Sequence, residues 1–301
     1  MSKLINPNTG KEIILKTTEK KKTVNKINSL KCNKEWAKLT VKKRIHYLEI
    51  FKNLLLKNKV ILANVLSTEI GKPLWESLNE ISASINKIDT TVTAMEYRLT
   101  YPQKKHTQTY IKPIGLVGVI GPFNFPIHIP NGQIIPALIT GNRVIVKPSE
   151  YAFKTSKFIE KLWKETFKNI VSPIEFCYGR KDIGELIVDN INVNAIFFTG
   201  STKTGKKIEK KCLNTNKLCV LEMGGNNALI VEDTFNALIS NIISSSLITS
   251  GQRCSCAQRI IINKNFSHII PKLVNEIKKI KINPFPSDKP TFMGPIVLNH
   301  V

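Results

Sequence analysis

LVGVI (Leu116–Ile120) is the first of five short apolar runs in the middle of the chain. The others are RVIVK (Arg143–Lys147), IEFCYG (174–179), AIFFTG (195–200) and LCVLEMGG (218–225). Amphipathic stretches separate them, as in 155–167, where Phe158, Leu162 and Trp163 fall on one side of a helix. Apolar runs that alternate with helical patterns are typical of a parallel sheet covered on both faces. We therefore predict an α/β fold with a doubly wound parallel sheet.

The first hundred residues show helical periodicity. Apolar residues recur at this spacing at Leu48, Phe51 and Leu55, and again at Ile81, Ile85, Ile88, Val92 and Met95. The step Gly71-Lys72-Pro73 separates the two patterns, because glycine and proline interrupt helices. We predict a mostly helical N-terminal part whose helices each bury one face.

Length and hydrophobicity are ordinary for a folded protein. The chain has 301 residues, of which 42% are hydrophobic, enough for two domains with a normal core. No stretch approaches the roughly 18–20 apolar residues of a membrane span. The first residues, MSKLINPNTGKEI, lack the apolar run of a secretory signal. We expect a cytoplasmic protein that does not act at a membrane.

The formal net charge of +23 raises the question of a nucleic-acid partner, because clustered Lys and Arg neutralise phosphates. The excess is mostly Lys and is spread along the chain, with no aromatic residues interleaved to stack on bases. Such an even excess favours compositional drift in a Lys-rich proteome. We predict that no nucleic acid is bound.

Six cysteines, at positions 32, 177, 212, 219, 254 and 256, match no disulfide framework. Only Cys254 and Cys256 lie close together, and a C-x-C pair without a second pair or a His cluster is a poor zinc site. We expect reduced thiols, most of them small core residues, and no metal.

Polar residues follow the apolar runs, where a doubly wound sheet binds its ligands. After Ile120 comes GPFNFPIHIPNG, in which prolines fix the backbone on both sides of Asn124. An amide held in this way can donate a hydrogen bond to a developing oxyanion. Asn is also common in turns for its backbone geometry, so this signal is weak when taken alone.

KPSE (147–150) follows the next run. Lys147 and Glu150 could hold the two vicinal hydroxyls of a ribose, and a carboxylate there favours NAD because it repels a 2′-phosphate. The alternative is a helix N-terminus capped by Ser149.

FFTGSTKTG (197–205) leads from a strand through a glycine-bounded loop into a helix. The backbone N–H groups of the loop and the helix N-terminus would form an anion site suited to a pyrophosphate. The loop residues are Gly200, Ser201, Thr202, Lys203, Thr204 and Gly205. A Walker loop needs Ser or Thr after Lys206, and Lys207 stands there, which argues against ATP or GTP hydrolysis.

Two reactive side chains come last. Glu222 stands at a strand end before the double glycine 224–225, which leaves room near the carboxylate. Cys254 follows an apolar helical stretch, 235–249, and a Ser-Gly break, and Arg253 beside it could stabilise the thiolate. Each motif has a structural explanation when it is taken alone.

Together, GPFNFP, KPSE, FTGS, LEMGG and GQRC resemble the aldehyde dehydrogenase superfamily over nearly the whole chain. The longer strings LEMGGNN, GQRCSCAQR and GPFNFPIHIPNG are similar to the narrower family of N-succinylglutamate 5-semialdehyde dehydrogenases. The resemblance implies NAD as cofactor, a semialdehyde as substrate, a Rossmann-like NAD-binding domain and part of an α/β catalytic domain.

The resemblance assigns the catalytic roles. Cys254 would attack the aldehyde to form a thiohemiacetal, and Asn124 would join the backbone N–H of Cys254 in an oxyanion hole. Hydride transfer to NAD would leave a thioester on the cysteine, and Glu222 would activate the water that hydrolyses it. Cys256 would only shape the pocket. Arg253 or Arg259 could pair with a carboxylate of the substrate; the alternative is that both face solvent or structural partners.

The resemblance also places the cofactor and the domains. Lys147, Ser149 and Glu150 would bind the adenosine ribose, and 200–205 would lie beside the pyrophosphate and nicotinamide. We expect a helical part of the cofactor domain, an oligomerisation-arm segment, a Rossmann-like NAD-binding domain and a partial catalytic domain. These units would span 1–104, 105–117, 118–223 and 224–301.

Members of the family are longer than this chain, which the resemblance presents as C-terminally truncated. The absent part would include a later E-x-F-G-P segment that holds the nicotinamide ribose, and the floor of the substrate pocket. An incomplete catalytic domain would expose a sheet edge and an apolar face. Two hypotheses follow. One is a semialdehyde dehydrogenase, active as a homo-oligomer or with a complementing C-terminal half, and the other is an inactive nucleotide-binding remnant.

Overall fold

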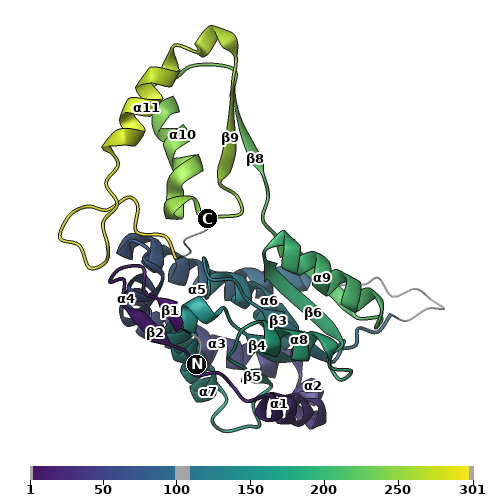
Figure 1. Cartoon of the computed structure of the whole chain (residues 1–301). Helices are drawn as coiled ribbons and strands as arrows, with labels where there is room; N and C mark the ends of the chain where they lie inside the picture. The colour runs from purple at the N-terminus through teal and green to yellow at the C-terminus, as the bar shows by residue number, and fades with distance from the viewer. Residues whose placement is uncertain (1–2, 99–108, 298–301) are drawn as a thin grey trace.

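The structure, a computed structural model, describes residues 3–98 and 109–297. Its centre is a parallel sheet with strand order β5-β4-β3-β6-β7 (Figure 1). The strands are β3 (Leu116–Ile120), β4 (Arg143–Lys147), β5 (Ile174–Phe176), β6 (Ala195–Gly200) and β7 (Leu218–Met223). Each predicted apolar run forms one strand, and the α/β prediction is confirmed.

Helices cover both faces of this sheet. They are α6 (His128–Ile139), α7 (Phe153–Thr166), α8 (Lys181–Asp189) and α9 (Thr202–Leu213), which follow β3, β4, β5 and β6 in turn. Successive residues of a strand face opposite sides. Val117 and Val119 of β3 join a core cluster with α6 and α7, whereas Leu116 and Ile120 join a second cluster with α8 and α9. The sheet is therefore doubly wound, as predicted.

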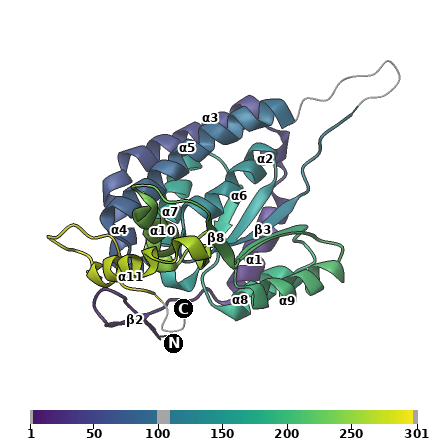
Figure 2. The ribbon, with the colours of Figure 1, turned by 90° about the horizontal axis from the view of Figure 1, so that it is seen from above.

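Helices also dominate the N-terminal part. They are α1 (Lys20–Cys32), α2 (Glu35–Lys38), α3 (Val41–Lys57), α4 (Lys59–Ile70) and α5 (Leu74–Arg98). α4 ends at Ile70 because Gly71 takes the left-handed conformation, with φ of 82°. The apolar residues of α3 and α5 enter the cluster formed by α6 and α7, whereas α1 packs on the opposite face of the sheet (Figure 2).

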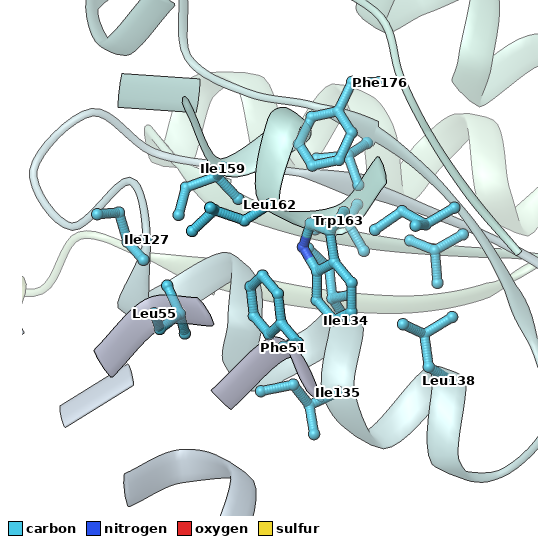
Figure 3. Close-up of a cluster of buried hydrophobic side chains, with 14 of the residues drawn as sticks. Phe51, Leu55, Ile127, Ile134, Ile135, Leu138, Ile159, Leu162, Trp163 and Phe176 are labelled. Carbon is cyan, nitrogen blue, oxygen red and sulfur yellow. The ribbon is translucent and has the colours of Figure 1, made fainter. Parts of the chain in front are cut away.

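The larger core cluster lies between the sheet and the layer formed by α3 to α7 (Figure 3). Phe51 of α3 stacks on Trp163 of α7, with ring centroids 3.6 Å apart, and both side chains are fully buried. Removing such a ring typically costs about 3–5 kcal/mol of stability. This packing fixes the N-terminal helices, α5 included, to the sheet that carries the site.

A hairpin precedes α1 in the chain. β1 (Lys3–Ile5) and β2 (Glu12–Ile14) pair antiparallel, which the helical periodicity did not indicate. The side chain of Asn8 donates hydrogen bonds to the carbonyls of Ser67 and Thr68, both at 2.9 Å, and so ties the hairpin to α4.

The C-terminal part projects from the main body (Figure 1). β8 (Asn227–Val231) and β9 (Ala257–Ile262) form a separate parallel pair, and α10 (Leu238–Leu247) and α11 (Ile269–Lys279) pack against it around a small cluster of their own. The chain after α11 returns to the body, where Gly294 approaches Gly71 so closely that a Cβ would collide with the Gly71 carbonyl.

The domain boundaries stay predictions. The end of the first unit and residues 105–108 of the expected arm lie outside the described residues. β3 begins at Leu116, two residues before the expected boundary, and β7 ends at Met223, where the expected NAD-binding domain ends. In 3–98 and 109–297, no helix is long and apolar enough to cross a membrane.

Candidate active site

The carboxyl ends of the strands border one cleft with a volume of about 1050 Å³. It lies at β3, where the strand order reverses and doubly wound sheets bind their ligands. Except for Thr202 and Gly205, all the predicted site residues line this cleft. These are Asn124, Lys147, Ser149, Glu150, Gly200, Ser201, Lys203, Thr204, Glu222 and Cys254.

Lys147 and Glu150 form an ion pair at the end of β4, with 3.1 Å between Nζ and Oε2 and side chains 8% and 23% exposed. The hydroxyl of Ser149 accepts a hydrogen bond from the Tyr151 N–H at 3.4 Å and caps the short 3-10 helix Glu150–Ala152. The cap and a ribose site are therefore compatible. The Lys147 ammonium keeps donors beyond the one that Glu150 accepts.

The loop after β6 has the predicted strand-to-helix form. Ser201 is the N-cap of α9, and its hydroxyl accepts the Thr204 N–H at 3.4 Å. Gly205 lies away from the cleft because it packs on β7, where a Cβ would collide with Met223 Sδ. The helix therefore begins beside the cleft, where its N–H groups favour an anion.

Cys254 is exposed at the cleft, and an unusual backbone leads to it. The helix expected over 235–249 is shorter, because α10 ends at Leu247 and Thr249 and Ser250 take left-handed φ values of 55° and 54°. Such values are rare for non-glycine residues, above all β-branched ones, and each costs about 1–3 kcal/mol. Contacts from elsewhere must hold this segment.

Burial distinguishes Cys254 from Cys256. Cys256 is 2% exposed, and its Sγ lies 3.5 Å from the Ile248 carbonyl oxygen. Burial raises the pKa of the Cys256 thiol, so it stays protonated and is a poor nucleophile. None of the six cysteines forms a disulfide, and Cys177 and Cys212 are also buried.

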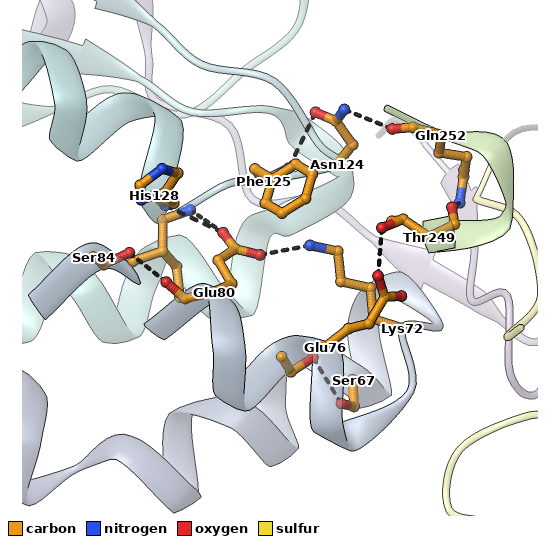
Figure 4. Close-up of polar contacts among 12 residues, drawn as sticks. Ser67, Lys72, Glu76, Glu80, Ser84, Asn124, Phe125, His128, Thr249 and Gln252 are labelled. Atoms are coloured by element: carbon orange, nitrogen blue, oxygen red, sulfur yellow. Dashed lines mark hydrogen bonds and ion pairs between the residues drawn. The ribbon is translucent and has the colours of Figure 1, made fainter. Parts of the chain in front are cut away.

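Asn124 lies beside the segment that carries the cysteine. Its Nδ2 donates to the Gln252 carbonyl at 2.6 Å, and its Oδ1 accepts the Phe125 N–H at 3.0 Å (Figure 4). A side chain that follows β3 and a segment more than a hundred residues later thus meet at the cleft.

Glu222 comes from β7, the edge strand of the sheet. Residues 218, 220 and 222 are exposed, whereas those between them pack toward the core. This alternation directs Glu222 away from the α9 side of the strand, and its carboxylate lines the cleft.

Of the two alternatives for Arg253 and Arg259, the structure favours structural partners. Arg253 Nη2 lies 2.8 Å from Glu76 Oε1, and its Nε donates to the Thr249 hydroxyl at 2.6 Å. Arg259 donates to the Asn226 carbonyl at 2.8 Å. Both guanidinium groups have structural partners.

Sequence reasoning missed Lys87 of α5 and the α6 residues His128 and Gln133, which also line the cleft. Lys87 has no carboxylate partner in the described residues, and its Cε lies 3.4 Å from where a Cβ on Gly132 would stand. Burial, together with the charge of Lys87, lowers the pKa of His128. Lys87 lies on a helix far from the strand ends in the sequence, so no local sequence pattern predicts that it lines the cleft.

The part of the chain that the structure describes holds no group of three or more His, Cys, Asp or Glu side chains arranged for a metal ion.

Comparison with known proteins identifies the family. The model described as the aldehyde dehydrogenase family matches residues 1–300. N-succinylglutamate 5-semialdehyde dehydrogenases from the Corby and Paris strains of Legionella pneumophila are 34% and 35% identical over 280 residues. The match covers 89% of this chain but 55% of each relative, so the chain spans about half the length of the curated relatives it matches.

Solved structures agree in fold. An aldehyde dehydrogenase of Brucella melitensis biovar abortus 2308 has a TM-score of 0.88 at 26% identity, over 98% of this chain and 63% of its own. A betaine aldehyde dehydrogenase of Staphylococcus aureus in complex with NAD+ has a TM-score of 0.90 at 24% identity, over 99% and 61%. From the family model, which matches almost every residue, and from this shared fold, we conclude that the chain belongs to the aldehyde dehydrogenase family.

Proposed function

We propose that this chain carries the cofactor site, the nucleophile and the base of an NAD-dependent semialdehyde dehydrogenase. One observation supports this most directly: a single cleft holds the exposed Cys254, Glu222 and Asn124 together with the Lys147–Glu150 pair. The relatives' names suggest N-succinyl-L-glutamate 5-semialdehyde as substrate and N-succinyl-L-glutamate as product, a step of arginine catabolism. We further propose a cytoplasmic enzyme.

In this proposal the Cys254 thiolate adds to the aldehyde carbon. The Asn124 amide and the backbone N–H of Cys254 donate hydrogen bonds to the oxyanion. Lys147, Glu150 and the start of α9 would hold NAD, which would supply the acceptor for the hydride of this carbon; the carbon would thereby be oxidised to the thioester level on Cys254. Glu222 then takes a proton from a water that attacks the thioester, and the thiolate leaves with release of the acid.

We propose NAD rather than NADP because of Glu150. Its carboxylate lies at the end of β4 beside Lys147, and the start of α9 supplies N–H groups for the pyrophosphate. A 2′-phosphate on the ribose would meet the negative charge of Glu150. The residues present therefore fit an unphosphorylated adenosine ribose.

Lys87 supports an acidic substrate. It lines the same cleft as Cys254 and has no carboxylate partner in the described residues. His128 beside it is held toward the neutral form by its lowered pKa. A carboxylate on the substrate would supply the missing counter-charge of Lys87, a role that Arg253 and Arg259 cannot take while they hold their structural partners.

We also propose that a polypeptide partner covers the open face of β8 and β9. Ile230 and Ile261 are neighbours in the register of these strands and are 63% and 50% exposed, on the face opposite α10 and α11. An apolar face of this kind marks a contact surface. A complementing chain is the partner we favour, and a second copy of this chain is the alternative.

The same open face favours a second candidate function, a nucleotide-binding chain without catalysis.

The experiment that distinguishes the two functions is NADH formation by the purified 301-residue chain with the semialdehyde and NAD, beside Cys254→Ala. Activity that the variant lacks supports the dehydrogenase. Folded protein that binds NAD but forms no NADH, even with a complementing half added, supports the second candidate.

A further inference from the structure

Helix α5 contacts both catalytic segments, although it supplies none of the proposed catalytic residues. We define the amide segment as 124–128 and the nucleophile segment as 249–254. Two carboxylates of α5, Glu76 and Glu80, lie four residues apart and therefore on the same side of successive turns. Each of them binds one of the two segments (Figure 4).

Glu80 binds the amide segment. Its Oε1 accepts the backbone N–H groups of Ile127 and His128 at 2.9 and 3.2 Å. Its Oε2 forms an ion pair with Lys72 at 2.6 Å, and the two side chains are only 0% and 1% exposed. A carboxylate that is fully buried and fully bonded holds the backbone after Asn124 in one place.

Glu76 binds the nucleophile segment. Its Oε1 accepts the Thr249 hydroxyl at 2.6 Å and lies 2.8 Å from Arg253 Nη2, and its side chain is 1% exposed. Thr249 in turn accepts the Arg253 Nε at 2.6 Å. These bonds reach the left-handed residue and the arginine that precedes Cys254, so they restrain the strained backbone from both ends.

Contacts between the two segments complete the arrangement. Asn124 donates to the Gln252 carbonyl at 2.6 Å. The ring of Phe125 makes cation–π contacts with Lys72 and Arg253. Lys72 Nζ lies 3.7 Å and Arg253 Cζ lies 5.0 Å from the ring centroid. The two segments and α5 therefore form a closed set of contacts.

We propose that Glu76 and Glu80 are positioning residues that set the relative place of the Asn124 amide and the Cys254 thiol. This inference rests on the proposed function for its catalytic meaning. One rigid helix gives both segments a common reference, and an oxyanion hole loses much of its effect when its donors move by about 1 Å. Loosening either contact should therefore lower turnover without weakening cofactor binding.

The first test is hydrogen exchange of the full chain, measured by mass spectrometry on peptides that cover the two segments. The variants are Glu76→Gln and Glu80→Gln. Glu80→Gln leaves the buried charge of Lys72 unpaired and can prevent folding. In that case the double variant Lys72→Met/Glu80→Gln replaces it, because removing both charges of a buried pair is better tolerated than removing one. Glu69→Gln is the matched control. Glu69 is also buried and accepts two backbone N–H groups, those of Lys154 and Thr155 at 2.7 and 2.8 Å, but both of these groups lie outside the amide segment and the nucleophile segment.

We expect Glu76→Gln to speed exchange in 248–256 by about tenfold or more, as loss of a charge-assisted hydrogen bond implies. Glu80→Gln should do so in 122–130, and Glu69→Gln only at the start of α7. Unchanged exchange in both segments for both Glu76→Gln and Glu80→Gln, or the same pattern for Glu69→Gln, overturns the proposal.

Kinetics supply the second readout. In the active protein, alone or with its complementing half, Glu76→Gln and Glu80→Gln should lower kcat at least about tenfold with KM for NAD unchanged, and Glu69→Gln should leave both unchanged. Wild-type kcat in both Glu76→Gln and Glu80→Gln contradicts the proposal. A wild-type protein that never oxidises an aldehyde rejects the proposed function instead, and the exchange experiment still decides whether α5 holds both segments.

Discussion

Single residues of the cleft differ mainly in what surrounds them. Cys254 and Cys256 are two positions apart, yet one thiol faces the cleft and the other is buried with a raised pKa. Arg253 is next to Cys254 in the sequence but is bound by Glu76. Lys87 is remote in sequence and lacks a partner among the described residues. Reactivity and specificity at this scale therefore depend on contacts that span the chain.

Lys87 gives a prediction about specificity. Lys87→Met should raise KM for N-succinylglutamate semialdehyde at least about tenfold, the usual loss when a charged hydrogen-bond donor to a substrate is removed. KM for a neutral aliphatic aldehyde should not change, because it carries no carboxylate. Steady-state kinetics on both substrates provide the measurement, with Lys87→Arg as the charge-retaining control. An equal change in KM for both aldehydes would show that Lys87 does not recognise the substrate carboxylate.

His128 gives a prediction about pH. Its pKa in the folded protein lies below the ordinary 6.5, chiefly because of burial. On acidification through 6.5 the unfolded chain takes up a proton before the folded protein does, so the contribution of His128 to stability is present above that value and is lost below it. The free energy of unfolding, from urea titrations between about pH 7.5 and 5.5, should fall less in His128→Gln than in wild type. The exposed His268→Gln is the control, and a fall identical in all three proteins would refute the prediction.

The helices and strands show how far the sequence predicts this fold. All the strands of the central sheet follow from continuous apolar runs, and α3 and α5 follow from their apolar spacing. Strand ends also located most of the cleft, because parallel strands bring their carboxyl ends to one edge. The hairpin of β1 and β2 does not follow from periodicity, because three-residue strands are too short to show a pattern.

The remaining features that the sequence did not predict depend on tertiary contacts. α10 ends before the expected position because Thr249 and Ser250 are held in left-handed conformations by contacts with other segments. Glu76, Glu80 and Lys87 look like solvated polar positions of a helix. Only the tertiary packing of α5 buries the two carboxylates against 127–128 and 249–253 and places Lys87 at the cleft. No local pattern encodes a contact between segments more than a hundred residues apart.

The N-terminus of α9 gives a prediction at this scale. Ser201→Ala removes the hydroxyl that accepts the Thr204 N–H, which should cost about 0.5–2 kcal/mol of stability. It should also weaken NAD binding, because the first turn that faces the cofactor would fray. Thermal unfolding and NAD titration are the measurements. Ser201→Asp, which keeps a cap but adds charge beside a pyrophosphate, should restore stability while binding NAD less well, and equal NAD affinity in all three proteins would contradict the prediction.

For the whole molecule, the main feature is the contrast between the body, whose five-stranded sheet has helices on both faces, and the open C-terminal part. The sheet of β8 and β9 has helices on one face only, and its other face carries exposed isoleucines. The chain also spans about half the length of its curated relatives. The exposed isoleucines are the observation on which the proposed polypeptide partner at this face rests.

The open face gives a prediction about association. Ile230→Lys/Ile261→Lys should reduce self-association of the purified chain, because charges on an exposed sheet oppose pairing and aggregation. Light scattering and analytical ultracentrifugation are the measurements. Ile191→Lys is the control, since Ile191 is 89% exposed but isolated in a loop. Association that persists in the double variant would show that another surface is responsible.

The central claim is that Cys254 is acylated during aldehyde oxidation and that Glu222 hydrolyses the product. Intact-mass spectrometry of Glu222→Gln, mixed with NAD and the semialdehyde and then quenched in acid, tests it most directly. We expect an added mass equal to one acyl group, located on Cys254 by peptide mapping, with about one NADH formed per site, and no adduct in Cys254→Ala. NADH formation by Cys254→Ala, or an acyl group mapped to another residue, would contradict it.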